Sequence, residues 1–294
     1  MTGFIFDRVA IIGFGLIGSS LARAVKASGT ARTIVACDSS TAARATIARL
    51  GLADTVTDDP AVAVDGADLV VLATPLGAYA EIARRIAPAL AHGAIVSDVG
   101  SVKGPVTRDL PPLLPSHVQL VPGHPVAGTE NSGPESGFET LFKGRWCILT
   151  PPPGTDPEAV RKVSELWQAC GSLIEIMEPE HHDKVLAITS HLPHLIAYTI
   201  VGTAANLEED AQSEVIKFSA SGFRDFTRIA ASDPTMWRDV FLNNREAVLE
   251  MLQRFTEDLT ALQRAIRRGE GDTLFDLFSR TREIRRRIID AHQA

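Results

Sequence analysis

The sequence predicts two kinds of structure in succession: an α/β region built on a doubly wound, mostly parallel sheet, and then an all-α region. In residues 1–178, short apolar stretches that suit buried strands alternate with stretches of helical periodicity. This alternation is typical of a parallel sheet covered by helices on both faces. Beyond residue 178 no convincing strand pattern follows. We therefore expect a domain boundary there, with an N-terminal domain over 1–178 and a helical domain over 179–294.

The individual elements follow from the same periodicity. We expect strands at 8–12, 33–37, 69–73, 94–97, 118–121, 146–149 and 173–176. We expect helices at 16–28, 40–50, 77–90, 103–110 and 157–170 in the first domain, and at 180–206, 209–219, 222–230, 234–268 and 271–292 in the second. The helix over 234–268 is long for a globular protein, which suits a helical core or the seam of a dimer.

The composition is that of an ordinary soluble protein. The chain has 294 residues, of which 45% are hydrophobic and 22% charged, and its net charge of −7 gives no indication of a nucleic-acid partner. Cys37, Cys147 and Cys170 lack metal-ligand spacing, so we expect buried free thiols in a reduced, cytoplasmic protein.

Neither a signal peptide nor a membrane span is expected. The first strand begins close to the start of the sequence, with no signal-peptide pattern before it. The longest apolar region, around 185–205, is interrupted by His191, Pro193 and His194. We therefore interpret this region as a core helix rather than a membrane helix.

The first predicted strand runs into a glycine-rich turn that opens a helix. The candidate loop has the form G-x-G-x-x-G and consists of Gly13, Phe14, Gly15, Leu16, Ile17 and Gly18. Its glycines would allow the tight turn, the approach of a pyrophosphate and close packing of helix on strand. The phosphates would then meet free N–H groups at the helix N-terminus. This predicts a dinucleotide site of the Rossmann type.

An acidic residue refines the prediction of the cofactor. The second strand ends at Asp38, twenty residues after Gly18. A carboxylate there can accept hydrogen bonds from the ribose hydroxyls of the adenosine half and would repel a 2′-phosphate. We therefore expect NAD rather than NADP.

Three loops at strand ends should converge near the other end of that cofactor, because ligands of doubly wound sheets lie beyond the carboxyl ends of the strands. One loop holds Thr74 and Pro75, a second holds Ser101, and a third runs from Gly123 through His124 to Glu130. A neutral His124 could take a proton from a substrate hydroxyl while hydride leaves the same carbon. Ser101 could orient it. A structural loop histidine and a helix N-cap remain the alternatives.

The helical half carries two further polar groups. His181, His182, His191 and His194 lack a metal-binding motif, so a metal site is improbable. A kink at Pro193 could aim His191 and His194 at a cleft, although both could be ordinary core histidines. Arg224 and Arg228 lie four residues apart and suit either capture of a carboxylate or an exposed ion-pair network.

Taken together, these segments resemble the prephenate/arogenate (cyclohexadienyl) dehydrogenases of tyrosine biosynthesis. The resemblance rests on the glycine run, on D-V-G-S-V-K at 98–103, on G-H-P-V-A-G-T-E at 123–130, on H-D…S-H-L-P-H at 182–194 and on D-F-T-R-I-A at 225–230. It implies a Rossmann-type domain, a helical dimerisation domain and a homodimer.

The resemblance also implies roles for individual residues. His124 is then the base that receives the proton of the ring hydroxyl, and Ser101 orients both His124 and the nicotinamide. Arg228 binds a substrate carboxylate, and Trp237 is expected to reach the site from the partner subunit. The expected substrate pocket consists of His191, His194, Arg228, Trp237 and Glu130.

The expected activity is NAD-dependent oxidative decarboxylation of prephenate, arogenate or both. Two alternatives stay open. A two-domain 3-hydroxyacid dehydrogenase would use a lysine of the interdomain helix, for which Lys184 is the candidate. A non-enzymatic NAD-binding sensor would have no need of His124.

Overall fold

The structure is a computed structural model that describes residues 3–206 and 221–290. The helix expected at 209–219 lies outside the described residues. Contacts divide the chain into two compact units, Met1–Arg245 and Glu246–Ala294. The described residues 179–206 and 221–245 thus belong to the same compact unit as the sheet. The expected domain boundary near 178 stays a prediction.

The first unit is built on one eight-stranded sheet in the order β3-β2-β1-β4-β5-β6-β7-β8. Its strands are β1 (Phe6–Ile12), β2 (Ala31–Cys37), β3 (Thr55–Thr57), β4 (Leu69–Leu72), β5 (Ile95–Asp98), β6 (Gln119–Pro125), β7 (Trp146–Leu149) and β8 (Leu173–Ile176). All neighbours are parallel except β6 and β7. The order reverses between β1 and β4, so a ligand crevice is expected at their carboxyl ends. The predicted doubly wound sheet is confirmed.

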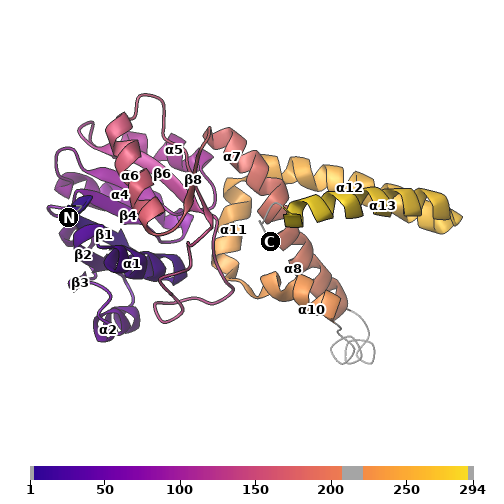
Figure 1. The fold of residues 1–294 in the computed structure, drawn as a ribbon, viewed down its shortest axis with the longest axis horizontal. Coiled ribbons are helices and arrows are strands. Elements are labelled where there is room, and N and C mark those ends of the chain that lie inside the picture. Colours follow the sequence, from indigo (N-terminus) through magenta and orange to yellow (C-terminus); the bar gives the residue numbers. More distant parts are fainter. Residues whose placement is uncertain (1–2, 207–220, 291–294) are drawn as a thin grey trace. The chain divides into compact units, whose positions relative to one another are not determined.

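Helices cover both faces of this sheet (Figure 1). The first-half helices are α1 (Leu16–Ser28), α2 (Thr41–Arg49), α3 (Pro60–Val64), α4 (Tyr79–Ile86), α5 (Gly104–Asp109) and α6 (Pro157–Ala169). Strand β1 shows why two layers form: Val9 and Ile11 belong to one buried cluster and Ala10 and Ile12 to the other. Because side chains alternate along a strand, an apolar residue at every position predicts cover on both sides.

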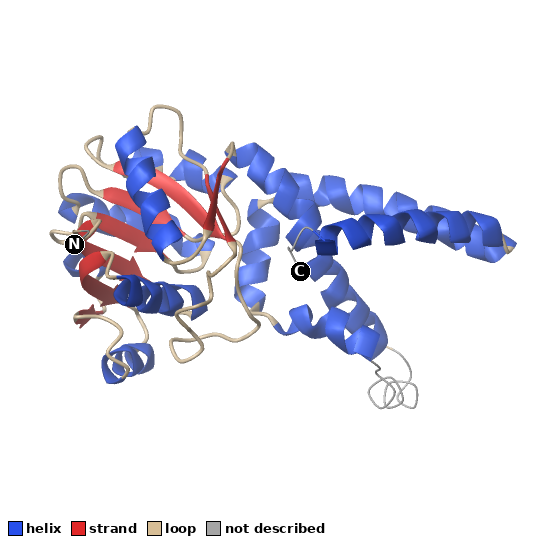
Figure 2. Cartoon of the chain, in the orientation of Figure 1, coloured by secondary structure: helices blue, strands red, loops and turns tan. Residues whose placement is uncertain are grey.

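Beyond β8 the described chain is helical, as Figure 2 shows. It continues with α7 (Pro179–Leu186), a π-helical turn (Ala187–His191), α8 (Leu192–Ala205), α10 (Ser221–Thr227) and α11 (Pro234–Asn243). The π turn ends just before Pro193, which occupies the first turn of α8, where its missing N–H costs little. The expected kink at Pro193 stays a prediction.

The expectation of one helix over 234–268 is wrong. Helix α11 ends at Asn243, and α12 (Arg245–Arg268) begins after Asn244, whose φ of −109° and ψ of 32° are not helical. The amide of Asn244 is buried and donates to the Asp183 carbonyl at 2.8 Å and to His191 Nδ1 at 3.1 Å. These tertiary bonds hold the interruption, which helical periodicity alone could not reveal.

The second unit contains α12 and α13 (Gly271–Asp290), joined by a turn in which Gly269 has a φ of +68°. Large apolar side chains on these helices remain exposed, among them Ile266, Phe275 and Phe278. The run Pro179–Ala205 of the first unit is apolar too. By length and composition it could cross a membrane, and 28% of its most apolar window is buried.

Candidate active site

The glycine loop between β1 and α1 has the shape that a dinucleotide requires. Gly13 has a φ of +97°, and a Cβ there would come within 2.7 Å of the Ala73 backbone. A Cβ on Gly18 would lie 2.0 Å from the Gly13 carbonyl oxygen. A Cβ on Gly15 would meet nothing within 4 Å, and no side chain caps the helix that starts there. The two outer glycines are therefore needed by the fold, and Gly15 leaves open the space beside free N–H groups that a pyrophosphate needs.

Asp38 follows β2 and faces this loop. Its carboxylate accepts from the Phe14 N–H at 2.9 Å and from the Ser40 N–H at 2.9 Å. Asp38 is half-buried, and each oxygen retains acceptor capacity for a ribose hydroxyl. The residue thus braces the loop, and its remaining acceptor capacity is compatible with the ribose contact expected of it.

Sequence reasoning missed an arginine beside Asp38. Arg44 comes from α2, and its guanidinium donates to the carbonyls of Asp38 and Ser39, both at 2.9 Å. It also pairs with Asp58 at 3.3 Å. Arg44 is six residues beyond Asp38 in the sequence, and only the start of helix α2 brings its guanidinium to the end of β2.

Thr74 and Pro75 follow β4, directly against the glycine loop. The Thr74 hydroxyl is buried without a hydrogen-bond partner. An unpaired buried hydroxyl is costly, so it indicates a place for a polar ligand group. This fits the expected cofactor contact at the end of β4.

His124 lies near the end of β6, which pairs with β5 on one side and with β7 on the other. Its side chain is 7% exposed, and its Nδ1 lies 2.9 Å from His182 Nε2. Burial lowers the pKa of His124 well below its usual value, and the positive charge of Lys103 and any protonation of His182 or His191 would disfavour its charged form further. The imidazole is therefore neutral at pH 7 and able to accept a proton.

His182 and Asp183 continue the hydrogen-bonded chain behind His124. His182 Nδ1 lies 2.8 Å from Asp183 Oδ1, and His182 is fully buried. Burial lowers the pKa of His182, while the Asp183 carboxylate acts in the opposite direction. Sequence analysis considers His182 only as a possible metal ligand, because a separation of 58 residues gives no indication of its contact with His124.

A buried lysine and a buried aspartate connect the segment that follows β5 with strand β6. Lys103 Nζ donates to Asp98 Oδ2 at 2.5 Å and to the Gly123 carbonyl at 2.7 Å, and both side chains are completely buried. Burial lowers the pKa of Lys103, and Asp98 opposes this shift. Asp98 also accepts from the N–H groups of Gly100 and Gly123. The loop of Ser101 and the strand of His124 are thus fixed to one another.

The histidines expected at the kink are brought to the same region. His191 is buried, and burial lowers its pKa to about 4. Ser101 is near it, since the Ser101 backbone counteracts this shift. His194 stacks on Trp237 with the ring centroids 3.7 Å apart. The expectation that Trp237 comes from a partner subunit differs from this arrangement, because α11 of the same chain places the ring against α8.

Arg228 and Glu130 form an ion pair at the edge of this group. Arg228 Nη1 lies 2.8 Å from Glu130 Oε2, and the two side chains are 58% and 33% exposed. The Arg228 charge contributes to lowering the pKa of His194, so the guanidinium is close to the stacked pair. A cation, an aromatic ring and a histidine with a lowered pKa thus lie close together, an arrangement that suits an anionic ring substrate.

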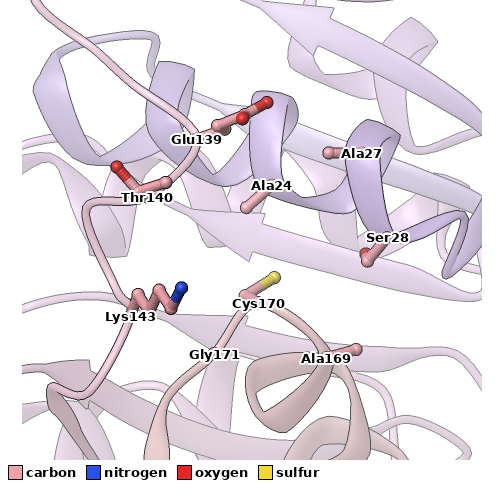
Figure 3. Close-up of a pocket in the computed structure, with 9 residues that line it drawn as sticks. All are labelled: Ala24, Ala27, Ser28, Glu139, Thr140, Lys143, Ala169, Cys170 and Gly171. Atoms are coloured by element: carbon pink, nitrogen blue, oxygen red, sulfur yellow. The ribbon is translucent and has the colours of Figure 1, made fainter.

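A separate shallow cavity of about 330 Å³ lies between α1 and the end of α6 (Figure 3). Its lining includes Ser28, Glu139, Lys143 and Cys170, and none of the expected site residues. Burial raises the pKa of Cys170 to about 12, so its thiol stays protonated.

Cys37, Cys147 and Cys170 are free and buried, as expected. Within residues 3–206 and 221–290, no group of three or more His, Cys, Asp or Glu side chains could hold a metal ion.

Comparison with known proteins covers both halves of the chain. The model of the prephenate dehydrogenase nucleotide-binding domain matches residues 21–176, and that of the prephenate dehydrogenase dimerization domain matches residues 178–280. The cyclohexadienyl dehydrogenase of Zymomonas mobilis is 43% identical over 288 residues, which are 98% of either chain. The prephenate dehydrogenase of Bacillus subtilis is 33% identical over 95% of this chain and 75% of its own.

A solved structure agrees with these sequence matches. The crystal structure of prephenate dehydrogenase from A. aeolicus in complex with hydroxyphenyl propionate and NAD+ superposes with a TM-score of 0.89. It is 35% identical and covers 96% of this chain and 98% of its own. On the matches of both domains, the chain belongs to the prephenate dehydrogenase family.

Proposed function

We propose that this chain oxidises and decarboxylates prephenate, arogenate or both, with NAD as the hydride acceptor. The observation that carries the proposal is His124: a buried, neutral imidazole at the strand ends, beside the Ser101 loop. The family of the chain and the shape of its glycine loop support the same activity. The substrate is a small anionic ring compound, and the enzyme is expected to act in the cytoplasm.

The reaction needs few groups from the protein. Prephenate and arogenate carry a ring hydroxyl and carboxylates, and loss of carbon dioxide makes the ring aromatic, which drives the reaction. NAD, held by the loop of Gly13, Gly15 and Gly18 with Asp38 on its ribose, supplies the hydride acceptor when bound. His124 takes the hydroxyl proton, Ser101 orients the hydroxyl and the imidazole, and Arg228 binds a carboxylate.

The alternative of a 3-hydroxyacid dehydrogenase is less well supported by the site. Lys184, its candidate lysine, is exposed on α7, whereas the neighbouring His182 is the residue that reaches the buried site. A catalytic lysine needs a position beside the reacting atoms. The sensor alternative leaves the buried position of His124 unexplained.

We infer that the working unit is a homodimer. Ile200 and Val201 on α8 and Phe275 and Phe278 on α13 are exposed in the single chain. Large exposed apolar surfaces of a soluble protein indicate an interface. A second copy of the chain would cover these side chains, in line with the match to a dimerization domain. No membrane is then required to cover them.

The test is NADH formation from NAD with purified protein, followed by absorbance with prephenate and, separately, with arogenate. Turnover of at least one of them is expected, and the ratio of the two kcat/KM values gives the preference. Oxidation of a 3-hydroxyacid that is lost in Lys184→Ala, without turnover of either ring compound, would replace the proposal by its alternative.

A further inference from the structure

Asp183, near the start of the helical half, forms hydrogen bonds with residues from several parts of the chain. Its Oδ1 accepts from the Lys103 N–H and its Oδ2 from the Gly104 N–H, both at 2.8 Å. Oδ1 also lies 2.8 Å from His182 Nδ1, and the Asp183 carbonyl accepts from Asn244 at 2.8 Å. The carboxylate therefore has little freedom to rotate, and it presents an acceptor to His182.

This acceptor determines where the protons of both imidazoles lie. A carboxylate can only accept, so the proton of a neutral His182 must be on Nδ1, and its Nε2 then carries a lone pair. His182 Nε2 is the atom that lies 2.9 Å from His124 Nδ1. The hydrogen bond between the rings therefore requires the proton of His124 on Nδ1. The Nε2 of His124 is left without a proton.

We infer that Asp183 is a positioning residue that acts through His182 to hold His124 in the Nδ1–H tautomer, with Nε2 free to accept the substrate's proton. The inference rests on the proposed function of His124 as the base. In water the Nε2–H tautomer of histidine predominates. Without Asp183 and His182, a large fraction of His124 would therefore present an N–H at Nε2 instead of a lone pair. After proton transfer, the carboxylate stabilises the imidazolium through His182.

Other charged and titratable groups around the pair are consistent with this state. Lys103 is engaged by Asp98, and His191 accepts from Asn244. Burial raises the pKa of the nearby Cys147 well above its usual value, so its thiol is protonated and carries no charge. The lowered pKa of His182 keeps it neutral, and a neutral ring is what the argument requires.

The direct test is the tautomer itself, read by nitrogen NMR of protein labelled at histidine with ¹⁵N. The signals of His124 are assigned as those that disappear in His124→Asn. We expect a protonated Nδ1 and an unprotonated Nε2 in the wild-type protein at neutral pH, without substrate or cofactor. A protonated Nε2 would overturn the inference. Because this readout does not depend on turnover, it separates the inference from the proposed activity.

Variants supply the functional test. Asp183→Asn should lower kcat by about 100-fold and move the acid limb of kcat/KM to lower pH, because the imidazolium loses its carboxylate. Glu180→Gln, an exposed acid on the same helix, is the matched control and should change neither value. An acid limb that stays in place in folded Asp183→Asn would reduce Asp183 to a structural residue and overturn the inference.

The chain of contacts can also be rebuilt in part. His182→Gln places a carbonyl oxygen where Nε2 lies, so it can still accept from His124 Nδ1, whereas His182→Leu cannot. We expect the Gln variant to retain about 10-fold more kcat than the Leu variant. Equal kcat values for the two folded variants would contradict the role of His182.

Discussion

Two polar groups of the first unit are held in different ways. The chain from His124 through His182 to Asp183 is buried, and its members are paired by hydrogen bonds of 2.8–2.9 Å. In the pair of Arg228 and Glu130, the arginine is exposed and the glutamate is half-buried. Unpairing a buried polar group costs about 1–3 kcal/mol, whereas an exposed ion pair contributes about 0–1 kcal/mol. The first group is therefore fixed before a substrate arrives, and the second can change partners at small cost.

This difference suggests a division of work. A proton acceptor must be in place, neutral and aligned at the moment of transfer, which a buried and fully paired group provides. An anion-binding arginine must exchange Glu130 for a substrate carboxylate, which a half-exposed side chain can do. Substitutions in the buried chain should therefore lower kcat, and substitutions in the exposed pair should raise KM.

The largest effect is expected at the buried end. His124→Asn should lower kcat by about 100-fold or more with little change in KM, because its contact with the moving proton exists mainly in the transition state. Steady-state kinetics with saturating NAD measure both values, and thermal unfolding checks that the variant is folded. A kcat within a few-fold of wild type would show that His124 is not the base.

The exposed pair should behave in the opposite way. Arg228→Ala is expected to raise KM for the ring substrate by about 10-fold, with a smaller change in kcat, because a carboxylate clamp binds substrate and transition state alike. Arg224→Ala removes the same side chain one turn earlier on α10 and should change KM by less than about 2-fold. An unchanged KM in Arg228→Ala, or equal changes in KM for Arg228→Ala and Arg224→Ala, would contradict the proposed role of Arg228 in substrate binding.

A smaller effect is expected at the adenosine end of the site. Asp38→Ser should reduce the preference for NAD over NADP by several-fold, because it removes a charge that repels a 2′-phosphate and leaves Arg44 to attract it. The ratio of kcat/KM for the two cofactors is the measurement. Asp38→Ser with Arg44→Ala is the matched control and should recover less NADP activity. Equal use of both cofactors by the wild type would refute the role of Asp38.

The sequence predicted the sheet well because its signal is local. Apolar strands, the glycine loop and the polar loops at strand ends are each encoded within a few residues. The topology of a doubly wound sheet then brings Thr74, Ser101 and His124 to one edge. No knowledge of distant contacts is needed for that part of the site.

The remainder depends on contacts that are remote in sequence. Asn244 interrupts a helical pattern only because its amide finds Asp183 and His191. The link from His124 to His182 spans 58 residues. Arg44 reaches Asp38 through the geometry of α2. None of these residues differs locally from its neighbours, so the pairing had to come from the structure.

The most direct test of the account is the pH profile of kcat/KM for the wild-type enzyme. The pKa of His124 is lowered by burial and by the charges around it, so the base stays neutral as the pH falls below the usual histidine value of about 6.5. Activity should therefore persist below that pH and be lost only as the pH falls through the lowered pKa. Protein held at each pH and returned to neutral pH should regain full activity, which separates titration from unfolding. A reversible acid limb at or above about pH 6.5 would contradict a buried, preorganised base.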